Sequence, residues 1–241
     1  MPAADLVPPA RRLWEQLAAV PVTFGDGATV VVSPSSRLCP AGFVGVVRIG
    51  DGVLATVPDD TATAAVREHL RAVGPAQAAD LDAWARRFRL GYALGPARLA
   101  YLSADGFTPV VAPGAPPVVP VERSGAEVVS LLASVVPAEA EESGLDGITS
   151  PAFVVRGRGG RLLAASGYRA WPGGAAHLCV LTARTERGGG LGRRTASAAV
   201  AHALAAGLLP QWRARVEPSR RVARALGFVE VGDQLGVQLR G

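Results

Sequence analysis

The chain has 241 residues, of which 49% are hydrophobic, so it predicts one large folded domain or two smaller ones and excludes a disordered chain. Its formal net charge of +5 comes from scattered arginines, with no lysine and no basic run interleaved with aromatics, which disfavours nucleic-acid binding. No apolar run reaches the roughly 20 residues of a membrane span and no signal-peptide pattern is visible, so we expect a cytoplasmic protein that binds neither membranes nor nucleic acids.

The N-terminal half mixes helix and strand signals. Gly50-Asp-Gly52 is a hairpin turn signal between two Val-rich stretches, and Asp59, Asp60 and Thr61 can cap a helix. The predicted elements are a helix over 8–19, a strand over 28–34, two strands within 42–58, a helix from about 61 to 73, a helix over 78–90 and a strand or turn over 93–103. This half contains no catalytic triad, metal cluster or phosphate loop.

A proline-rich stretch separates the two halves. Residues 106–123 contain five prolines, which fix φ and lack a backbone donor, so neither a helix nor a central strand is expected there. We therefore predict a boundary near residue 115, with an N-terminal accessory α/β domain over 1–115 and a second domain over 116–241.

The C-terminal half is patterned more clearly. Its predicted elements are a helix over 124–136, strands over 151–158, 161–171 and 175–182, a helix to about 206, a strand over 211–216, a helix from Pro218 to about 226 and a hairpin or strand pair over 228–239. The dipeptide Gly159-Gly160 and the sequence WPGG mark the turns between the first three strands. The element order is α-β-β-β-α-β-α-β.

A glycine-rich, arginine-flanked stretch, TERGGGLGRR, joins the third of these strands to the next helix. A helix start leaves backbone N–H groups without internal partners and carries partial positive charge, so it suits phosphates. Glycines let the backbone approach such a ligand, and Arg187, Arg193 and Arg194 add positive charge. The P-loop and dinucleotide-binding patterns do not fit, because the chain has no lysine and the pattern Gly-x-Gly-x-x-Gly is incomplete.

The segment Arg187-Gly-Gly-Gly190-Leu-Gly192 fits the pattern [RQ]-x-x-G-x-[GA] and resembles the pyrophosphate motif of the GNAT superfamily, the acetyl-CoA-dependent N-acetyltransferases. The strand meander before it and the ending SRRVARALGF (219–228) are also similar to that family. The resemblance covers roughly residues 120–241. It implies a mixed, largely antiparallel α/β sheet flanked by helices, with the fourth family strand splayed from the fifth.

The resemblance also implies a cofactor site. It places the pantetheine arm of acetyl-CoA along the strand at Val180, Leu181 and Thr182, and the pyrophosphate against the glycine loop. The cofactor-binding residues predicted in and beside this loop are Arg187, Gly188, Gly189, Gly190, Leu191, Gly192 and Arg193. An amine would attack the thioester directly in a ternary complex.

Three residues that the family often uses are missing. Ala223 stands where a Tyr acid is frequent, Val216 or a neighbour where an Asn is frequent, and Ala175 or Ala176 where a Glu is frequent. The general acid and base are therefore unknown from the sequence, and a non-catalytic acyl-CoA-binding or sensing module is the alternative function.

His177, Glu142 and Gln211 are the candidate catalytic residues. His177 has a pKa range suited to a base but can equally be structural, and Gln211 could position an acceptor or a water. Glu142 and Asp146 have helical spacing and could share a face that attracts a cationic amine, with a solvated acidic face as the alternative. The wider acidic set is Glu139, Glu141, Glu142 and Asp146.

The two cysteines show no metal-ligand spacing. Cys39 and Cys179 are read as buried free thiols, so neither a metal site nor an acyl-cysteine intermediate is expected. The predicted activity is acetyl transfer from acetyl-CoA to an unidentified small-molecule or protein amine. The N-terminal half could be a degenerate copy of the same fold, and it could cover the acceptor pocket or build a homodimer contact.

Overall fold

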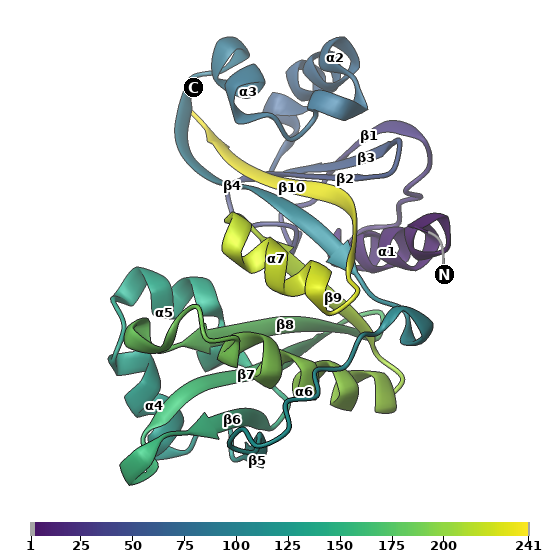
Figure 1. The fold of residues 1–241 in the computed structure, drawn as a ribbon. Coiled ribbons are helices and arrows are strands. Elements are labelled where there is room, and N and C mark those ends of the chain that lie inside the picture. The colour runs from purple at the N-terminus through teal and green to yellow at the C-terminus, as the bar shows by residue number, and fades with distance from the viewer. Residues whose placement is uncertain (1–2, 241) are drawn as a thin grey trace. The chain divides into compact units, whose positions relative to one another are not determined.

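The computed structural model describes residues 3–240, and the chain divides into two compact units (Figure 1). Unit 1 comprises the described residues up to Tyr101, the short segment Arg213–Glu217, and the stretch from Glu230 to the end of the described chain. Unit 2 comprises Leu102–Trp212 and Pro218–Val229. The backbone therefore returns to unit 1 twice after leaving it.

This division falls earlier than the predicted boundary between residues 115 and 116. The proline-rich segment is tied to unit 2, because the backbone N–H of Thr108 donates to the Leu226 carbonyl at 3.0 Å. The Val110 N–H donates to the Ser197 hydroxyl at 2.9 Å. Further along, Val119–Val121 forms β5, an edge strand. The proline-rich segment is therefore hydrogen-bonded to unit 2 and ends in an edge strand of its sheet. The chain passes from unit 1 to unit 2 between Tyr101 and Leu102.

Unit 1 is a sheet with helices on it, as its Val-rich strand pattern predicts. Its elements are α1 (Ala3–Leu17), β1 (Gly27–Val32), β2 (Val44–Ile49), β3 (Gly52–Val57), α2 (Thr63–Val73), α3 (Leu81–Arg87), β4 (Leu90–Tyr101) and most of β10 (Val229–Leu239). Neighbouring strands follow the order β1-β3-β2-β10-β4. The predicted hairpin at Gly50-Asp-Gly52 is confirmed by the antiparallel pairing of β2 with β3, whereas β1 pairs with β3 in parallel.

Two predicted elements of the N-terminal half have different bounds. The first helix begins at Ala3, so Pro8 and Pro9 lie inside it rather than at its start. The helix predicted over 78–90 is α3, which begins after Asp80, whose Oδ1 accepts the N–H of Asp82 at 2.9 Å.

The prediction of a hairpin over 228–239 is wrong. Those residues form the single strand β10, which pairs antiparallel with β2 from Gly232 opposite Ile49 to Val237 opposite Val44. Gly232 allows β10 to lie close to β2 and does not form a turn, because a Cβ there would lie 1.9 Å from the Arg48 carbonyl oxygen. The Asp233 carboxylate accepts hydrogen bonds from Arg48 and Arg98, with the Arg48 Nε bond at 2.8 Å.

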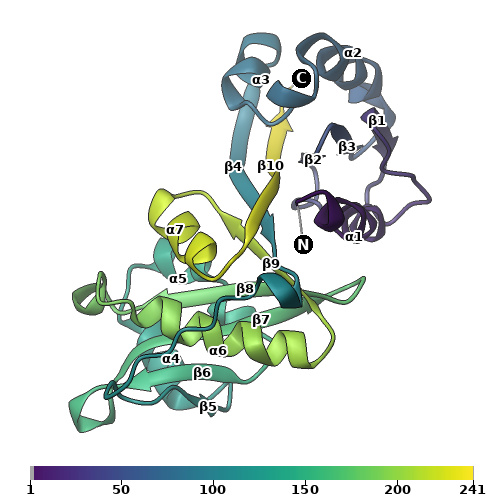
Figure 2. The same cartoon turned by 45° about the vertical axis from the view of Figure 1, so that its right-hand side comes forward.

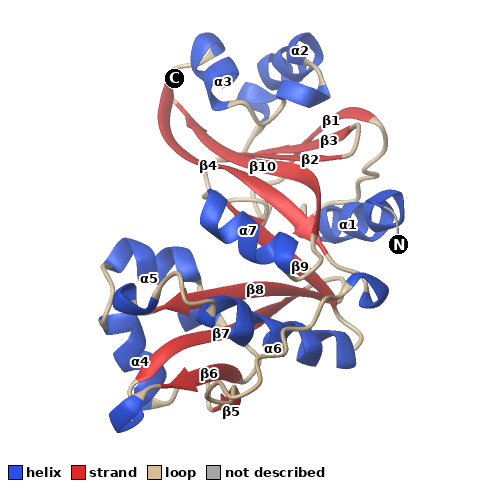
Figure 3. Cartoon of the chain, in the orientation of Figure 1, coloured by secondary structure: helices blue, strands red, loops and turns tan. Residues whose placement is uncertain are grey.

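Unit 2 consists of strands and helices, drawn red and blue in Figure 3, and contains most of the C-terminal half of the sequence. Its elements are β5, α4 (Ala126–Ala133), α5 (Pro137–Ser143), β6 (Ala152–Arg156), β7 (Leu162–Trp171), β8 (Ala175–Thr182), α6 (Leu191–Ala205), the first part of β9 (Leu209–Ala214) and most of α7 (Glu217–Ala225). The strand order is β9-β8-β7-β6-β5, with β8 and β9 parallel and the other pairs antiparallel. This largely antiparallel, helix-flanked sheet confirms the predicted fold class.

Helices cover both faces of the unit 2 sheet. In Figure 2, α6 runs across the front of β6, β7 and β8, whereas α4 and α5 lie behind them. Side chains alternate along β8, so Cys179 and Leu181 enter a hydrophobic cluster with Val128 and Leu131 of α4. Val180 and Thr182 face α6, because a Cβ on its Gly192 would approach both. Among residues 3–240, no helix has the length and apolar character needed to cross a membrane.

Candidate functional site

The parallel strands β8 and β9 pair over a short distance only. Three residue pairs lie opposite each other in this ladder: Ala175 with Leu209, Ala176 with Pro210, and His177 with Gln211. On its other side, β8 stays paired with β7 from Ala175 to Thr182. The edge of β8 from Leu178 to Thr182 is therefore not paired with β9, which leaves backbone donors and acceptors available for an extended ligand.

The glycine loop follows the unpaired edge directly. Gly188 has φ +86° and Gly190 has φ +76°, a conformation that L side chains rarely adopt, and α6 begins at Leu191. The backbone N–H of Arg194 donates to the Gly190 carbonyl at 3.1 Å. The N–H groups of the three residues before Arg194 stand in the first turn, where a helix has no internal acceptor for them. The loop thus presents glycine backbone and a positive helix end.

Gly192 brings the start of α6 against the end of β8. A Cβ at this position would lie 2.9 Å from Thr182 Oγ1 and 3.5 Å from Val180 Cγ1. A larger residue would require the Thr182 side chain or its surroundings to shift. The predicted pantetheine strand and the predicted pyrophosphate loop are therefore adjacent, as one continuous ligand would require.

Arg187 is held by protein groups, a feature that the sequence analysis missed. Its two terminal nitrogens donate to both carboxylate oxygens of Glu139 on α5 at 3.0 and 2.9 Å, and its Nε donates to the Thr182 carbonyl at 3.3 Å. The hydrogen bonds and positive charge of Arg187 lower the pKa of the Glu139 carboxyl. The guanidinium thus fixes the loop relative to α5 and to β8.

The other two loop arginines differ from Arg187. Arg194 donates a hydrogen bond to the carbonyl of Pro116 in the proline-rich segment. Arg193 is exposed and makes no hydrogen bond or ion pair through its side chain with the part of the chain that the structure describes. Arg193 is therefore the loop guanidinium best placed to meet an anion.

His177 and Gln211 meet where β8 and β9 separate. His177 Nδ1 lies 2.5 Å from Gln211 Oε1, and the histidine ring stacks on Trp171, with centroids 4.3 Å apart and an interplanar angle of 12°. The Gln211 side chain is 0% exposed, and its Nε2 has no hydrogen-bond partner among the described residues. Two of the three predicted catalytic candidates are therefore in direct contact.

The third candidate, Glu142, lies in the last turn of α5. Helix α5 ends at Ser143, and Gly144 follows in the left-handed conformation, with φ +60°. Asp146 lies beyond that break in a short 3-10 turn, so the expected shared helix face of Glu142 and Asp146 does not form. Both side chains are exposed.

The remaining predicted features behave as structural groups. Neither cysteine forms a disulfide within the described residues. Cys179 is buried as expected, 2% exposed within the α4 cluster, whereas Cys39 is only partly buried. Ala223, which stands where the family often has a Tyr, is 3% exposed on α7. No group of three or more His, Cys, Asp or Glu side chains within residues 3–240 could hold a metal ion.

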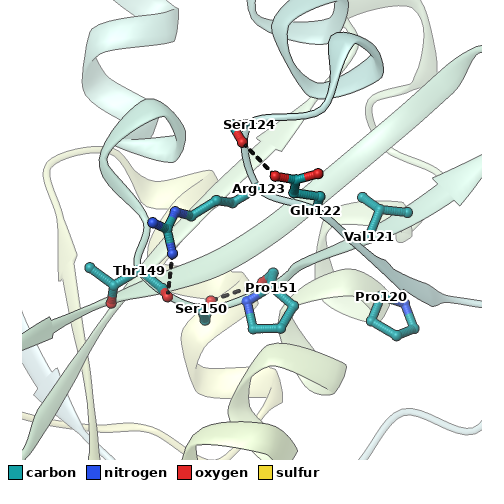
Figure 4. Close-up of a pocket in the computed structure, with 8 residues that line it drawn as sticks. All are labelled: Pro120, Val121, Glu122, Arg123, Ser124, Thr149, Ser150 and Pro151. Atoms are coloured by element: carbon teal, nitrogen blue, oxygen red, sulfur yellow. Dashed lines mark hydrogen bonds between the residues drawn. The ribbon is translucent and has the colours of Figure 1, made fainter.

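A pocket of about 550 Å³ lies at the other edge of the unit 2 sheet (Figure 4). It is lined by residues 120–124 and 149–151, beside the edge strand β5. Its polar groups largely bond to one another. Arg123 Nη1 donates to the Thr149 carbonyl at 3.2 Å, and the Ser124 hydroxyl donates to Glu122 at 3.1 Å. Because β6 and β7 separate β5 from β8, this pocket is distinct from the glycine loop.

Comparison with known proteins identifies a family match over part of the chain. Residues 163–233 match the GNAT acetyltransferase family. This range runs from the second residue of β7 through β8, the glycine loop, α6, β9 and α7 into the first part of β10. The GNAT resemblance of the C-terminal half is thereby confirmed. Among curated protein sequences, none matches this chain.

Solved structures with a similar fold include two described as acetyltransferases. A GCN5-related N-acetyltransferase from Kribbella flavida has a TM-score of 0.52 at 16% identity, covering 67% of this chain and 64% of that one. An acetyltransferase from the GNAT family from Colwellia psychrerythraea has a TM-score of 0.47 at 13% identity, covering 63% of this chain and 58% of that one. The chain thus matches less than two thirds of either relative's length. At 16% identity, the likeness to the Kribbella flavida structure shows a similar fold alone.

Proposed function

We propose, on the basis of the GNAT acetyltransferase match over residues 163–233, that this protein transfers an acetyl group from acetyl-CoA to an amine. The observation that carries the proposal is the unpaired edge of β8 leading directly into a left-handed glycine loop at the start of α6. Family membership supports acyl transfer in general. Acetyl-CoA as donor, an amine as acceptor and direct transfer in a ternary complex are the finer parts of the proposal.

The residues present suit acetyl-CoA. The backbone of Val180, Leu181 and Thr182 would pair with the amides of the pantetheine arm, as a neighbouring strand would. The pyrophosphate would accept hydrogen bonds from the loop and the first turn of α6, with Arg193 adding charge. Arg187 would shape this loop through Glu139 instead of contacting the phosphates itself.

The chemistry requires one bond to form and one to break. The amine nitrogen bonds to the thioester carbonyl carbon, the carbon–sulfur bond breaks, and CoA leaves as a thiolate that takes a proton from solvent. A covalent acyl-cysteine is disfavoured, because Cys179 is buried in an apolar cluster and burial raises the pKa of Cys39 to about 12. Direct transfer between the two bound substrates needs no reactive thiol and is therefore the mechanism that we propose.

Calorimetric titration with acetyl-CoA, CoA and dephospho-CoA tests the cofactor site. We expect Gly190→Asp to weaken acetyl-CoA binding by at least about tenfold, because it places a carboxylate against the pyrophosphate and side-chain bulk at φ +76°. Gly159→Asp is the matched control, since Gly159 also has a positive φ and open space around it but lies between β6 and β7. Equal affinity of the Gly190 variant and the wild type would refute the loop assignment.

Thiol release with a panel of amines tests the reaction. Amine-dependent appearance of CoA supports an acetyltransferase. Binding of acetyl-CoA without amine-dependent release would instead support the non-catalytic acyl-CoA-binding module, which the buried Ala223 at the family's acid position favours.

A further inference from the structure

One row of side chains crosses three strands of the unit 2 sheet where β8 and β9 separate. Arg169 on β7 lies opposite His177 on β8, and His177 lies opposite Gln211 on β9. Side chains paired in this way share one face of a sheet, and the contact of His177 with Gln211 is an instance. Beyond this row β8 continues without β9 toward the glycine loop. A thioester that follows β8 from that loop would therefore end near the row.

The guanidinium of Arg169 is positioned by packing against a turn on this face. A Cβ on Gly147 would lie 3.3 Å from the Arg169 Cζ and 3.4 Å from its Nη2, so the guanidinium lies against the backbone of this glycine. Gly147 ends the short turn after α5, and Leu145 of the same turn packs with Cys179 of β8. Cys179 lies two residues after His177 and shares its face of the sheet. The guanidinium is therefore held beside the row, although Arg169 is exposed.

No acceptor in the described part of the chain satisfies this guanidinium. The Arg169 side chain makes no hydrogen bond or ion pair within residues 3–240. Asp146, which precedes Gly147 in the same turn, is exposed and forms no ion pair with it. Glu139 of α5 is already bound to Arg187. Arg169 thus keeps its N–H donors for a group from outside the chain.

A second donor in the same row also lacks an acceptor. The side chain of Gln211 is 0% exposed, and its Nε2 has no hydrogen-bond partner among the described residues. Buried donors are normally paired, because leaving one unsatisfied is costly. Arg169 and Gln211 stand two strand spacings apart, about 10 Å between their Cα atoms, which a small ligand can span. The row therefore offers donors, one of them cationic, to a ligand that supplies acceptor atoms.

We propose that the acceptor amine of this protein carries a carboxylate, as an amino acid does, and that Arg169 binds that carboxylate. This inference rests on the acetyl-transfer function proposed above. A guanidinium presents parallel N–H donors that match the two oxygens of a carboxylate. With the carboxylate on the β7 side of β8, the amine would lie toward β9, at the end of the pantetheine path. Gln211 Nε2 would donate to an uncharged acceptor atom of the bound substrates.

Kinetics with matched pairs of amines tests this substrate class. Each amino acid of a panel is compared with its decarboxylated amine, which keeps the amine and the side chain and lacks only the carboxylate. We expect the wild type to acetylate the amino acids with a kcat/KM at least about tenfold higher, the factor expected of a hydrogen-bonded pair between charged groups. A preference for the decarboxylated amines would overturn the proposal and would indicate recognition of a cation by acidic residues such as Asp146.

Substitution of Arg169 should remove the preference. The kcat/KM ratio between amino acid and decarboxylated amine should fall by about tenfold in Arg169→Gln, and it should invert in Arg169→Glu, whose carboxylate repels that of the substrate. Arg158→Gln is the matched control, because Arg158 is another exposed arginine and lies in the turn between β6 and β7. The ratio compares two substrates of one protein sample, so partial loss of folded protein does not alter it. An unchanged ratio in Arg169→Gln would overturn the role of Arg169.

Equilibrium binding separates this inference from the proposed function. In the presence of saturating CoA, which carries no acetyl group to transfer, calorimetry should show tighter binding of an amino acid than of its decarboxylated amine. Arg169→Gln should abolish that difference. A wild-type protein that binds carboxylate-bearing amines in this way but never releases CoA from acetyl-CoA would overturn acetyl transfer and leave Arg169 as a carboxylate-binding residue. Amine-dependent release of CoA that is indifferent to the carboxylate would overturn this inference and leave acetyl transfer intact.

Discussion

His69 on α2 is a buried histidine of unit 1 whose pKa is lowered from its ordinary value of 6.5. Burial is the larger cause and the positive charge of Arg87 the smaller. Its ring packs edge-on against Trp84 and Phe88, and its Nε2 has no hydrogen-bond partner within the described chain. The fold therefore accommodates the neutral ring and resists the charged one.

This lowered pKa predicts a pH-dependent free energy of unfolding. The unfolded chain takes up the proton more readily, so the contribution of His69 is fully present above about pH 6.5 and is lost as the pH falls through the folded pKa. The variant His69→Phe keeps an aromatic ring and removes the titrating group. In urea unfolding, its free energy of unfolding should fall less between pH 8 and pH 5 than that of the wild type. Identical pH dependence in variant and wild type would contradict this account.

Single residues also show what the sequence can and cannot predict about the site. Gly188, Gly190 and Gly192 were predictable, because a positive φ or a close approach requires glycine and leaves a visible pattern. The pairing of Arg187 with Glu139 was not, since 48 positions separate two residues of ordinary type. A side-chain pair of this kind depends on the packing of α5, which no local pattern encodes.

The ion pair between α5 and the glycine loop places a negative charge beside a proposed phosphate site. Glu139→Gln keeps an oxygen that can accept from Arg187 but removes the charge that offsets it. We expect acetyl-CoA to bind about 1.5- to 5-fold more tightly in this variant at low ionic strength. This factor corresponds to the free energy that an exposed ion pair typically contributes. The gain should shrink in concentrated salt, because exposed charges are screened.

Calorimetry at low and high salt measures this effect. Glu141→Gln is the matched control, because Glu141 is exposed on the same short helix and makes no ion pair with the described residues. Weaker binding by Glu139→Gln would show instead that the ionic pair is needed to hold the loop in shape.

Strand β10 shows why one element was misread. Gly232-Asp233 has the composition of a turn, yet the chain runs straight through it. The glycine allows the backbone of β2 to approach, and the aspartate meets Arg48 and Arg98, which lie 185 and 135 positions away. By contrast, the hairpin at Gly50-Asp-Gly52 joins strands adjacent in sequence, so its local signal was sufficient.

For the molecule as a whole, the same strand makes unit 1 discontinuous in sequence. In the strand order of this unit, β10 lies between β2 and β4, and it supplies Leu235 and Val237, both 0% exposed, to the core that contains Trp84. A boundary read from the proline-rich segment alone gives an N-terminal domain without this strand. Contacts across more than 100 residues decide the division, and sequence composition does not report them.

A fragment of residues 1–101 should therefore fail to fold cooperatively. Without β10, strands β2 and β4 lose a neighbour and the apolar cluster loses two of its fully buried side chains. Urea denaturation followed by circular dichroism should show no sigmoidal transition for the fragment, and a synthetic peptide of residues 228–240 should restore one. In the full chain, Leu235→Ala should lower the free energy of unfolding by about 2–5 kcal/mol. Cooperative unfolding of the fragment alone would mean that β10 adds to a unit already stable without it.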